Sequence, residues 1–313
     1  MWAFIARRIL ATIPVMAVVA MVVFLMLRLS PTDPAAMIAG DYASSEQIAR
    51  IRTQLGLDRP IYVQFVEWLG QILRGDLGVS IFSNLPVTTL IAQRIEPTLM
   101  LAATSIVFSI VVAVPLGVLA AWKAGTWIDR LVMLFAVAAF SFPVFVLAYV
   151  LIFELSIAWR IFPTQGYRSP FVDFAGFLHH IALPTLAIST IFIALITRIT
   201  RASVIEVLGE DYIRTARAKG QIERRVLFRH ALRNAAVPIV TVIGLSLVIL
   251  IGNAIVTESV FNIPGVGRLV VDAVLKRDYP VIQGLVIALS FTYIIINLII
   301  DIVYAMLDPR IRY

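Results

Sequence analysis

The chain has no cysteine in 313 residues and only three histidines. Without cysteine there can be no disulfide, no thiolate nucleophile and no cysteine-ligated metal. His179 and His180 are neighbours, so on a helix their rings point in different directions, and no third ligand stands beside them. We therefore expect no metal site, although a histidine-ligated metal remains the alternative interpretation.

Charge is also scarce, since 14% of the residues are charged and 60% are hydrophobic. A soluble domain rarely has this balance. Six runs lack Asp, Glu, Lys and Arg altogether, and each holds roughly 20 residues, the length that crosses a ~30 Å hydrocarbon core. These runs are 9–27, 97–122, 131–153, 174–197, 234–257 and 279–300. The sequence predicts an all-α membrane protein with six transmembrane helices, and the first run is too long for a signal peptide of ~7–15 apolar residues.

Catalytic patterns are missing as well. No GxxxxGK[ST] phosphate-binding loop occurs, so the chain is not expected to bind ATP in that way. The charge-free runs hold no paired carboxylates or Cys/His set, which argues against an intramembrane enzyme. They also hold no carboxylate near the midplane, which disfavours a transporter driven by an ion gradient, the second alternative.

The basic residues predict the orientation. If the N-terminus is cytoplasmic, the inner segments carry more than half of the 26 Lys and Arg residues. The positive-inside rule then predicts that both termini are cytoplasmic. The net charge of +7 reflects this topology and anionic lipid, so nucleic acid is not expected as a partner.

Three segments follow from this topology. Residues 1–29 form the N-terminal segment and first transmembrane helix, residues 30–96 lie outside the membrane, and residues 97–313 form a core of five transmembrane helices. The outer segment shows helical patterns at 44–55 and 62–73, and it is too small to be an independent domain.

A polar stretch at 203–238, which overlaps the cytoplasmic loop 200–236, separates the fourth and fifth spans. Glu210 and Asp211 favour a helix N-terminus, Arg217 and Lys219 favour its C-terminus, and Gly220 is a natural left-handed stop. A second amphipathic piece runs through Val226, Leu227, His230 and Ala231. The stretch is either a basic loop that only sets the topology or a helix that binds in a partner's groove.

Other polar and small residues lie inside the spans. Ser105, Ser109, Ala113, Gly117 and Ala121 recur every four residues, which predicts close helix packing within the chain or against a second subunit. Four prolines lie in spans and should kink them: Pro14, Pro115, Pro143 and Pro184. The fifth span and its end carry polar residues that either line a pathway or bond neighbouring helices: Ser246, Asn253, Thr257 and Glu258.

The polar stretch also has a recognisable pattern. Glu-Asp-Tyr-Ile-Arg-Thr-Ala-Arg-Ala-Lys-Gly (210–220) and Arg-His-Ala-Leu-Arg-Asn-Ala-Ala-Val-Pro (229–238) resemble the signature loop of binding-protein-dependent ABC permeases of the peptide and nickel group. The resemblance extends over the whole chain. It includes Leu-Gly-Leu-Asp-Arg-Pro (55–60), Gly-Asp-Leu-Gly (75–78), Phe-Asn-Ile-Pro-Gly-Val-Gly-Arg (261–268), Arg-Asp-Tyr-Pro-Val-Ile-Gln (277–283) and Asp-Pro-Arg-Ile-Arg (308–312). The chain departs from the family pattern in three places. Arg214-Thr215-Ala216 stands where the family has Glu-Ala-Ala, His230 to Arg233 matches its Ile-Xaa-Leu-Pro only loosely, and Pro-Thr-Asp-Pro (31–34) stands where it has Pro-Gly-Asp-Pro.

This resemblance implies a type I importer permease in the bacterial cytoplasmic (inner) membrane, with no cofactor of its own. The implied partners are a second homologous permease, two cytoplasmic ATPases that bind ATP and Mg, and an extracytoplasmic binding protein. The implied cargo is a di- or oligopeptide or glutathione, with a nickel chelate or another small solute as the alternative. The implied ATPase-coupling residues are Glu210, Asp211, Tyr212, Ile213, Arg214, Thr215, Ala216, Ala218, Lys219 and Gly220.

Overall fold

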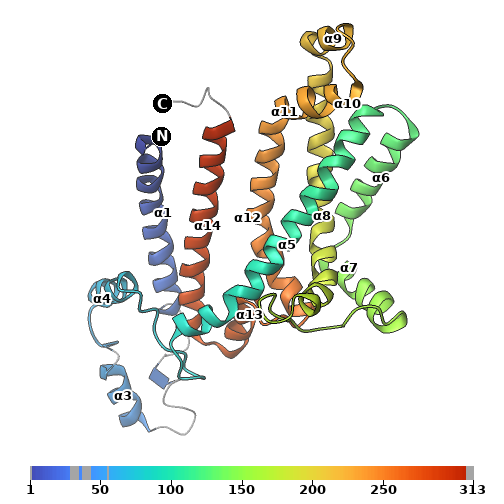
Figure 1. Ribbon diagram of the computed structural model, residues 1–313. Helices are drawn as coiled ribbons and strands as arrows, with labels where there is room; N and C mark the ends of the chain where they lie inside the picture. The colour runs from blue at the N-terminus through green and yellow to red at the C-terminus, as the bar shows by residue number, and fades with distance from the viewer. Residues whose placement is uncertain (1, 29–34, 37–43, 55, 308–313) are drawn as a thin grey trace. The chain divides into compact units, whose positions relative to one another are not determined.

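The computed structural model describes residues 2–28, 35–36, 44–54 and 56–307, and it is helical nearly throughout (Figure 1). Within those ranges no strand forms, and only an isolated bridge pairs Val79 with Pro86. The Pro-Thr-Asp-Pro turn (31–34) and the 308–312 motif lie outside the described residues. The chain divides into two compact units, which we describe separately.

The first unit comprises residues 95–268 and 296–307 of the described chain. Its helices are α5 (Val87–Trp122, from residue 95 on), α6 (Trp127–Ser141), α7 (Val144–Leu151), the π-helix η1 (Ile152–Ala158), α8 (Phe174–Leu208), α9 (Asp211–Ala218), α10 (Glu223–Arg225), the π-helix η2 (Val226–Ala231), α11 (Leu232–Asn234) and α12 (Ala236–Val260). The last turns of α14 (Tyr279–Leu307) also belong to it.

Five described helices are long and apolar enough to cross a membrane, and the number is six if one bent pair forms a single broken span. That pair is α6 with α7 and η1, which meet at an angle of 100°. Phe142 is extended immediately before Pro143, as the residue before a proline prefers to be, so the helix breaks there. The kink predicted at Pro143 is confirmed, whereas Pro14, Pro115 and Pro184 lie inside helices that continue past them.

The stripe of small residues on α5 packs against α8. A Cβ on Gly117 would lie 2.6 Å from the Thr200 Cβ, so only glycine permits this approach. The Ser189 hydroxyl donates to the Ser105 carbonyl at 3.1 Å, and the Thr197 hydroxyl donates to the Ala113 carbonyl at 3.3 Å. Of the two partners that the stripe allowed, the structure places a helix of the same chain on it.

The second unit comprises residues 2–94 and 269–295. It contains α1 (Trp2–Arg28), α3 (Ser45–Gln54), α4 (Ile61–Leu73), most of α13 (Val266–Lys276) and the first half of α14. The two helices predicted near 44–55 and 62–73 are confirmed as α3 and α4, while Leu55 lies outside the described residues. Sequence patterns did not predict α13.

Two polar contacts hold this unit together. The buried carboxylate of Asp278 accepts bonds from the Ser80 hydroxyl at 2.6 Å and the Ile81 N–H at 3.2 Å. The Gln283 amide donates to the Val23 carbonyl at 3.0 Å, which ties α14 to α1. Residues of the Arg-Asp-Tyr-Pro-Val-Ile-Gln motif thus act as structural anchors in this unit.

Candidate functional site

The polar stretch forms a short helical projection at one end of the first unit, where α9 and α10 extend beyond α8 and α11 (Figure 1). α9 begins at Asp211, whose negative charge in the first turn suits the positive end of the helix dipole. At its other end the Gly220 N–H donates to the Arg217 carbonyl and the Gln221 N–H to the Ala216 carbonyl. Gly220 has φ +74°, so these bonds form a Schellman motif, and the predicted left-handed stop is confirmed.

Three contacts brace α9 against the residues that follow it. The Ile213 side chain is fully buried within the chain. The Asn234 amide donates to the Tyr212 hydroxyl at 2.7 Å, although the Tyr212 ring is partly exposed. The Arg217 guanidinium bonds the Glu223 carboxylate at 2.7 Å, and this bond raises the pKa of Arg217. α9 is therefore held in a fixed position by its own chain.

The second predicted amphipathic piece is confirmed as the π-helix η2. Its buried side chains Val226, Leu227 and Ala231 face the interior, where Leu227 and Ala231 pack in one cluster with residues of α5 and α8. Val118 and Val204 are the central members of that cluster from those two helices. The brace under α9 thus connects directly to two of the membrane-spanning helices.

The outer side of this segment is apolar and basic, a feature that the sequence analysis missed. Ile222 is 72% exposed and Phe228 is 52% exposed. Together with Arg224, Arg225 and Arg229 they line an open hollow of ≈ 430 Å³. The sequence did contain a signal for this surface, namely two large apolar side chains among arginines in a polar stretch. Exposed apolar residues that lie close together often mark an interface.

A bidentate ion pair fixes the neighbouring turn between α5 and α6. The buried carboxylate of Asp129 accepts bonds from Arg201 Nε at 2.5 Å and Nη2 at 2.7 Å, and from the Gly125 N–H at 2.9 Å. Because Arg201 belongs to α8, this pair joins α6 to α8 at the same end as the α9 projection. Nothing in the sequence pattern singled out this pair, since its members are 72 residues apart.

The polar residues of α12 bond mainly to their own helix. The buried hydroxyls of Ser246 and Thr257 donate to the carbonyls four residues earlier, at 2.7 Å and 3.0 Å. The half-buried Asn253 amide donates to the Ile249 carbonyl at 3.3 Å. Their role in a pathway stays a prediction.

Glu258 lies at the other end of α12 and is fully buried. Its carboxylate accepts bonds from the Thr98 hydroxyl at 2.5 Å and the Arg268 N–H at 2.9 Å, so it caps the first turn of α13. A Cβ on Gly265 would collide with this carboxylate, and a Cβ on Gly267 would lie 2.6 Å from the Ile255 Cα. In this arrangement Glu258 anchors the loop that follows α12, which explains both glycines.

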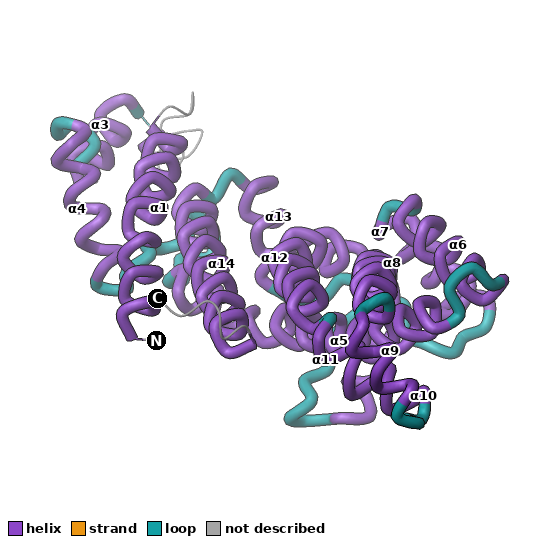
Figure 2. The backbone as a smooth tube through the Cα atoms, turned by 90° about the horizontal axis from the view of Figure 1, so that it is seen from above, coloured by secondary structure: helices purple, strands orange, loops and turns teal. Residues whose placement is uncertain are grey.

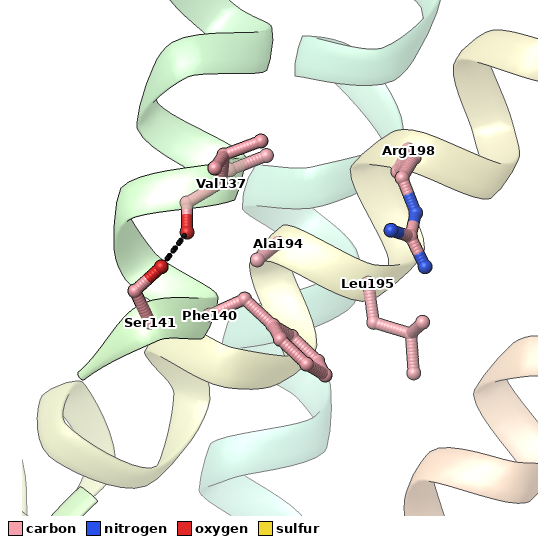
Figure 3. Close-up of a pocket in the computed structure, with 7 residues that line it drawn as sticks. Val137, Phe140, Ser141, Ala194, Leu195 and Arg198 are labelled. Atoms are coloured by element: carbon pink, nitrogen blue, oxygen red, sulfur yellow. Dashed lines mark hydrogen bonds between the residues drawn. The ribbon is translucent and has the colours of Figure 1, made fainter. Parts of the chain in front are cut away.

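A small hollow lies between α6 and α8. Figure 3 shows Phe140 and Ser141 from α6 on one side and Leu195 and Arg198 from α8 on the other, with the Ser141 hydroxyl bonded to the Val137 carbonyl at 2.9 Å. Its volume of ≈ 150 Å³ is below the range of about 300–1,000 Å³ that small-molecule sites occupy. We assign it no function.

The adjacent histidines bond to backbone carbonyls. The ring of His179 bonds to the Ile161 carbonyl at 2.6 Å, and that of His180 to the Gly176 carbonyl at 2.7 Å. Each ring thus has a structural partner, and no cluster of three metal-ligating side chains forms among the residues that the structure describes.

Comparison with known proteins links the whole chain to membrane transport. Residues 113–313 match the family described as the binding-protein-dependent transport system inner membrane component, and residues 1–102 match the N-terminal region of such components. A probable peptide ABC transporter permease protein of Sinorhizobium fredii is 50% identical over 313 residues, which is 100% of both chains. A glutathione transport system permease protein of Escherichia coli K12 is 44% identical over 310 residues, 99% of each chain, and that of Salmonella typhimurium is 44% identical over 312 residues, also 99% of each.

Solved structures agree on the fold. A chain of the MetNI methionine ABC transporter, crystallised in inward-facing conformations, superposes with a TM-score of 0.58 over 71% of this chain and 97% of that one, at 18% identity. A second crystal form of the same transporter gives the same TM-score over 70% of this chain and 96% of that one. The fold is therefore that of type I ABC importer permeases.

Proposed function

The chain belongs to the family of binding-protein-dependent transport system inner membrane components, and from this premise we propose that it forms half of a translocation pore that imports short peptides. The names of relatives that align over the full chain support di- or oligopeptides or glutathione as cargo, in preference to a nickel chelate or an ion-gradient mechanism. A binding protein delivers the peptide on the outer side, and separate ATPase subunits supply the energy.

One observation carries the coupling part of this proposal. α9 is short, held to η2 and α11 by Ile213, Tyr212 and Asn234, and through η2 connected to α5 and α8. A partner that moved this projection would therefore act on several membrane helices at once. We propose that the ATPase binds here, along residues Glu210 to Gly220, and that ATP and Mg stay in that subunit.

The contact surface includes more than the predicted helix. Ile213 is buried within the chain and supports α9, whereas Tyr212, Ile222 and Phe228 present apolar area outward. Binding energy at interfaces concentrates in such aromatic anchors, while exposed arginines at the rim guide association. The arginines that line the hollow suit an acidic groove on the ATPase.

The second permease completes the pore. Asn253 is the proposed pathway residue that the chain leaves partly exposed, whereas Ser246, Thr257 and Glu258 are buried within the chain. A homologous partner provides the opposite wall. We propose that both termini are cytoplasmic, because the basic residues cluster on that side and the α9 projection must reach a cytoplasmic ATPase.

The test is made on the complex purified with its ATPase and reconstituted in proteoliposomes. Tyr212→Ala should leave the complex in the membrane but reduce peptide uptake for each ATP hydrolysed, because the ring is lost from the contact. Tyr212→Phe is the matched control: it removes only the hydroxyl that accepts from Asn234. Normal uptake by Tyr212→Ala would contradict the coupling role, and loss of the protein from the membrane would indicate a folding role instead.

The cargo is tested separately on the binding protein. Mass spectrometry of small molecules that co-purify with it should find di- or oligopeptides or glutathione. A nickel chelate found in their place would overturn the cargo but not the coupling mechanism.

A further inference from the structure

Helix α4 exposes an apolar stripe that none of the described residues of the second unit covers. Tyr62, Val66 and Leu73 are 70%, 66% and 80% exposed. Their spacings of four and seven residues place them along one line of the helix. The exposed polar residues Glu67 and Gln71 lie roughly 120° and 160° round the helix from the centre of this stripe, at about 100° per residue. α4 thus has an apolar side and a polar side, both facing outward.

The remaining face of α4 packs on the end of α1, and the two helices lie side by side in both views (Figures 1 and 2). The Phe24 ring meets the Phe65 ring at 5.2 Å and the Trp68 ring at 5.5 Å. Leu69 and Ile72 pack against the cluster that holds Ala20 and Val23. This contact fixes the level of α4 along α1.

That level is inside the apolar part of the first span. The span's apolar window runs from Arg7 to Met26. Phe24 and Ala20 lie two and six residues before its end, which is about 3–9 Å along a helix that rises 1.5 Å per residue. A helix packed at this level meets the boundary between acyl chains and headgroups, where amphipathic helices lie in the plane of a membrane.

We propose that α4 is a membrane-surface helix, bound to the lipid leaflet at the C-terminal end of α1. Tyr62, Val66 and Leu73 enter the edge of the acyl region, and Glu67 and Gln71 face water. α1 also exposes apolar side chains at this level, namely Met21, Val22 and Met26. Tyr62 suits this boundary because tyrosine concentrates there, and the exposed Arg74 at the end of the helix can meet lipid phosphate.

The natural absence of cysteine allows a direct test. Single-cysteine variants Val66→Cys and Gln71→Cys are made in the complex, labelled with an environment-sensitive fluorophore and placed in nanodiscs. The label at 66 should be quenched by phospholipids that carry a doxyl group near the top of the acyl chain and be protected from aqueous iodide. The label at 71, on the polar side, should show the opposite pattern.

Two outcomes would overturn the proposal. Quenching of the label at 66 by iodide and not by doxyl lipid would place the stripe in water. Shielding from both quenchers would mean that a protein surface, either the second permease or the binding protein, covers it.

A second measurement separates lipid binding from folding. A label at Leu73→Cys should lose its doxyl quenching when Val66→Glu is added, because a buried carboxylate drives the stripe out of the acyl region. The matched change Gln71→Glu adds the same charge on the polar side and should leave that quenching unchanged. Equal effects of the two changes would contradict the proposal.

Discussion

The two loops that flank α12 are built in opposite ways. The loop after it, residues 261–265, is closed: Phe261 and Ile263 are buried and the Glu258 carboxylate caps α13 beneath them. The stretch before it, residues 209–235, buries Ile213 but leaves Ile222 and Phe228 exposed. The closed loop belongs to the motif at 261–268. The stretch before α12 holds the motif at 210–220 and most of the motif at 229–238, and Ile222 and Phe228 lie between these two. The difference indicates that the closed loop stabilises the fold and that the stretch before α12 is available to a partner.

The largest effect should come from opening the closed loop. Glu258→Ala leaves the half-buried Arg268 N–H and Thr98 hydroxyl without this acceptor, and each unsatisfied group costs at most about 1–3 kcal/mol. We expect a clear drop in the thermal midpoint of the purified complex and less protein in the membrane. Ser259→Ala is the control, because that exposed hydroxyl bonds only to its own helix at Ile255. An unchanged midpoint for Glu258→Ala would contradict the anchoring role.

A change in the open stretch, residues 209–235, should weaken ATPase binding and leave the stability of the protein nearly unchanged. Phe228→Ala removes a half-exposed ring, so stability should change by less than about 0.5 kcal/mol. Loss of an aromatic anchor at an interface costs about 2 kcal/mol, so affinity for the ATPase should fall by roughly 30-fold. Phe171→Ala removes an even more exposed ring outside this stretch and should leave ATPase binding unchanged. Equal binding by both variants would remove Phe228 from the contact.

A glycine pair refines the comparison within the same end of the first unit. Gly220→Val and Gly125→Val each place a β-branched residue at positive φ, with no atom within 4 Å of the new Cβ, so each should cost about 1–2 kcal/mol. Only Gly220 sets the direction in which the chain leaves α9. We therefore expect similar losses in thermal midpoint but a loss of coupled ATP hydrolysis only for Gly220→Val. Uncoupling by both variants would mean that backbone strain anywhere at this end of the unit impairs coupling, and that the direction set by Gly220 is not the cause.

The smallest effect concerns pH at the N-cap of α8, outside both regions. The carboxylate of Asp173 accepts a hydrogen bond from the Gly176 N–H at 2.8 Å and a second one from the Arg168 guanidinium. These bonds, the Gly176 bond above all, lower the pKa of Asp173. Because the pKa of this carboxyl is lower in the folded protein than in the unfolded chain, its charge stabilises the fold when the pH is above the unfolded pKa of about 3.9. This stabilisation is lost as the pH falls through the folded pKa. Thermal midpoints of the wild type and Asp173→Asn should differ slightly at pH 5 and converge at lower pH. A constant difference across this range would exclude the charge as its cause.

Periodicity and charge predicted much of this architecture. The spans, α3, α4 and the Gly220 stop each depend on residues close together in sequence, such as the run of charge-free residues or the pair Lys219-Gly220. The break at Pro143 was predictable for the same reason, because a proline constrains the residue immediately before it.

Contacts between distant residues were not predictable from one sequence. Asp129 and Arg201, or Thr98 and Glu258, are brought together only by the packing of α5, α6, α8 and α12. Ile213 illustrates the same limit: the resemblance placed it among the ATPase-coupling residues, but its side chain is fully buried within the chain. A side chain's partner depends on tertiary structure, which propensity does not determine.

The segment from Glu223 to Val260 has a mechanical consequence. α10, η2, α11 and α12 follow one another with a single non-helical residue, Ala235, whose ψ is 0°. A nearly continuous helical path thus runs from the exposed arginines to the buried Glu258, and it changes direction where α11 meets α12 (Figure 1). Ala235 is the one point at which this helical path is interrupted. A force applied at Phe228 would therefore bend the segment at Ala235 before it reached Glu258.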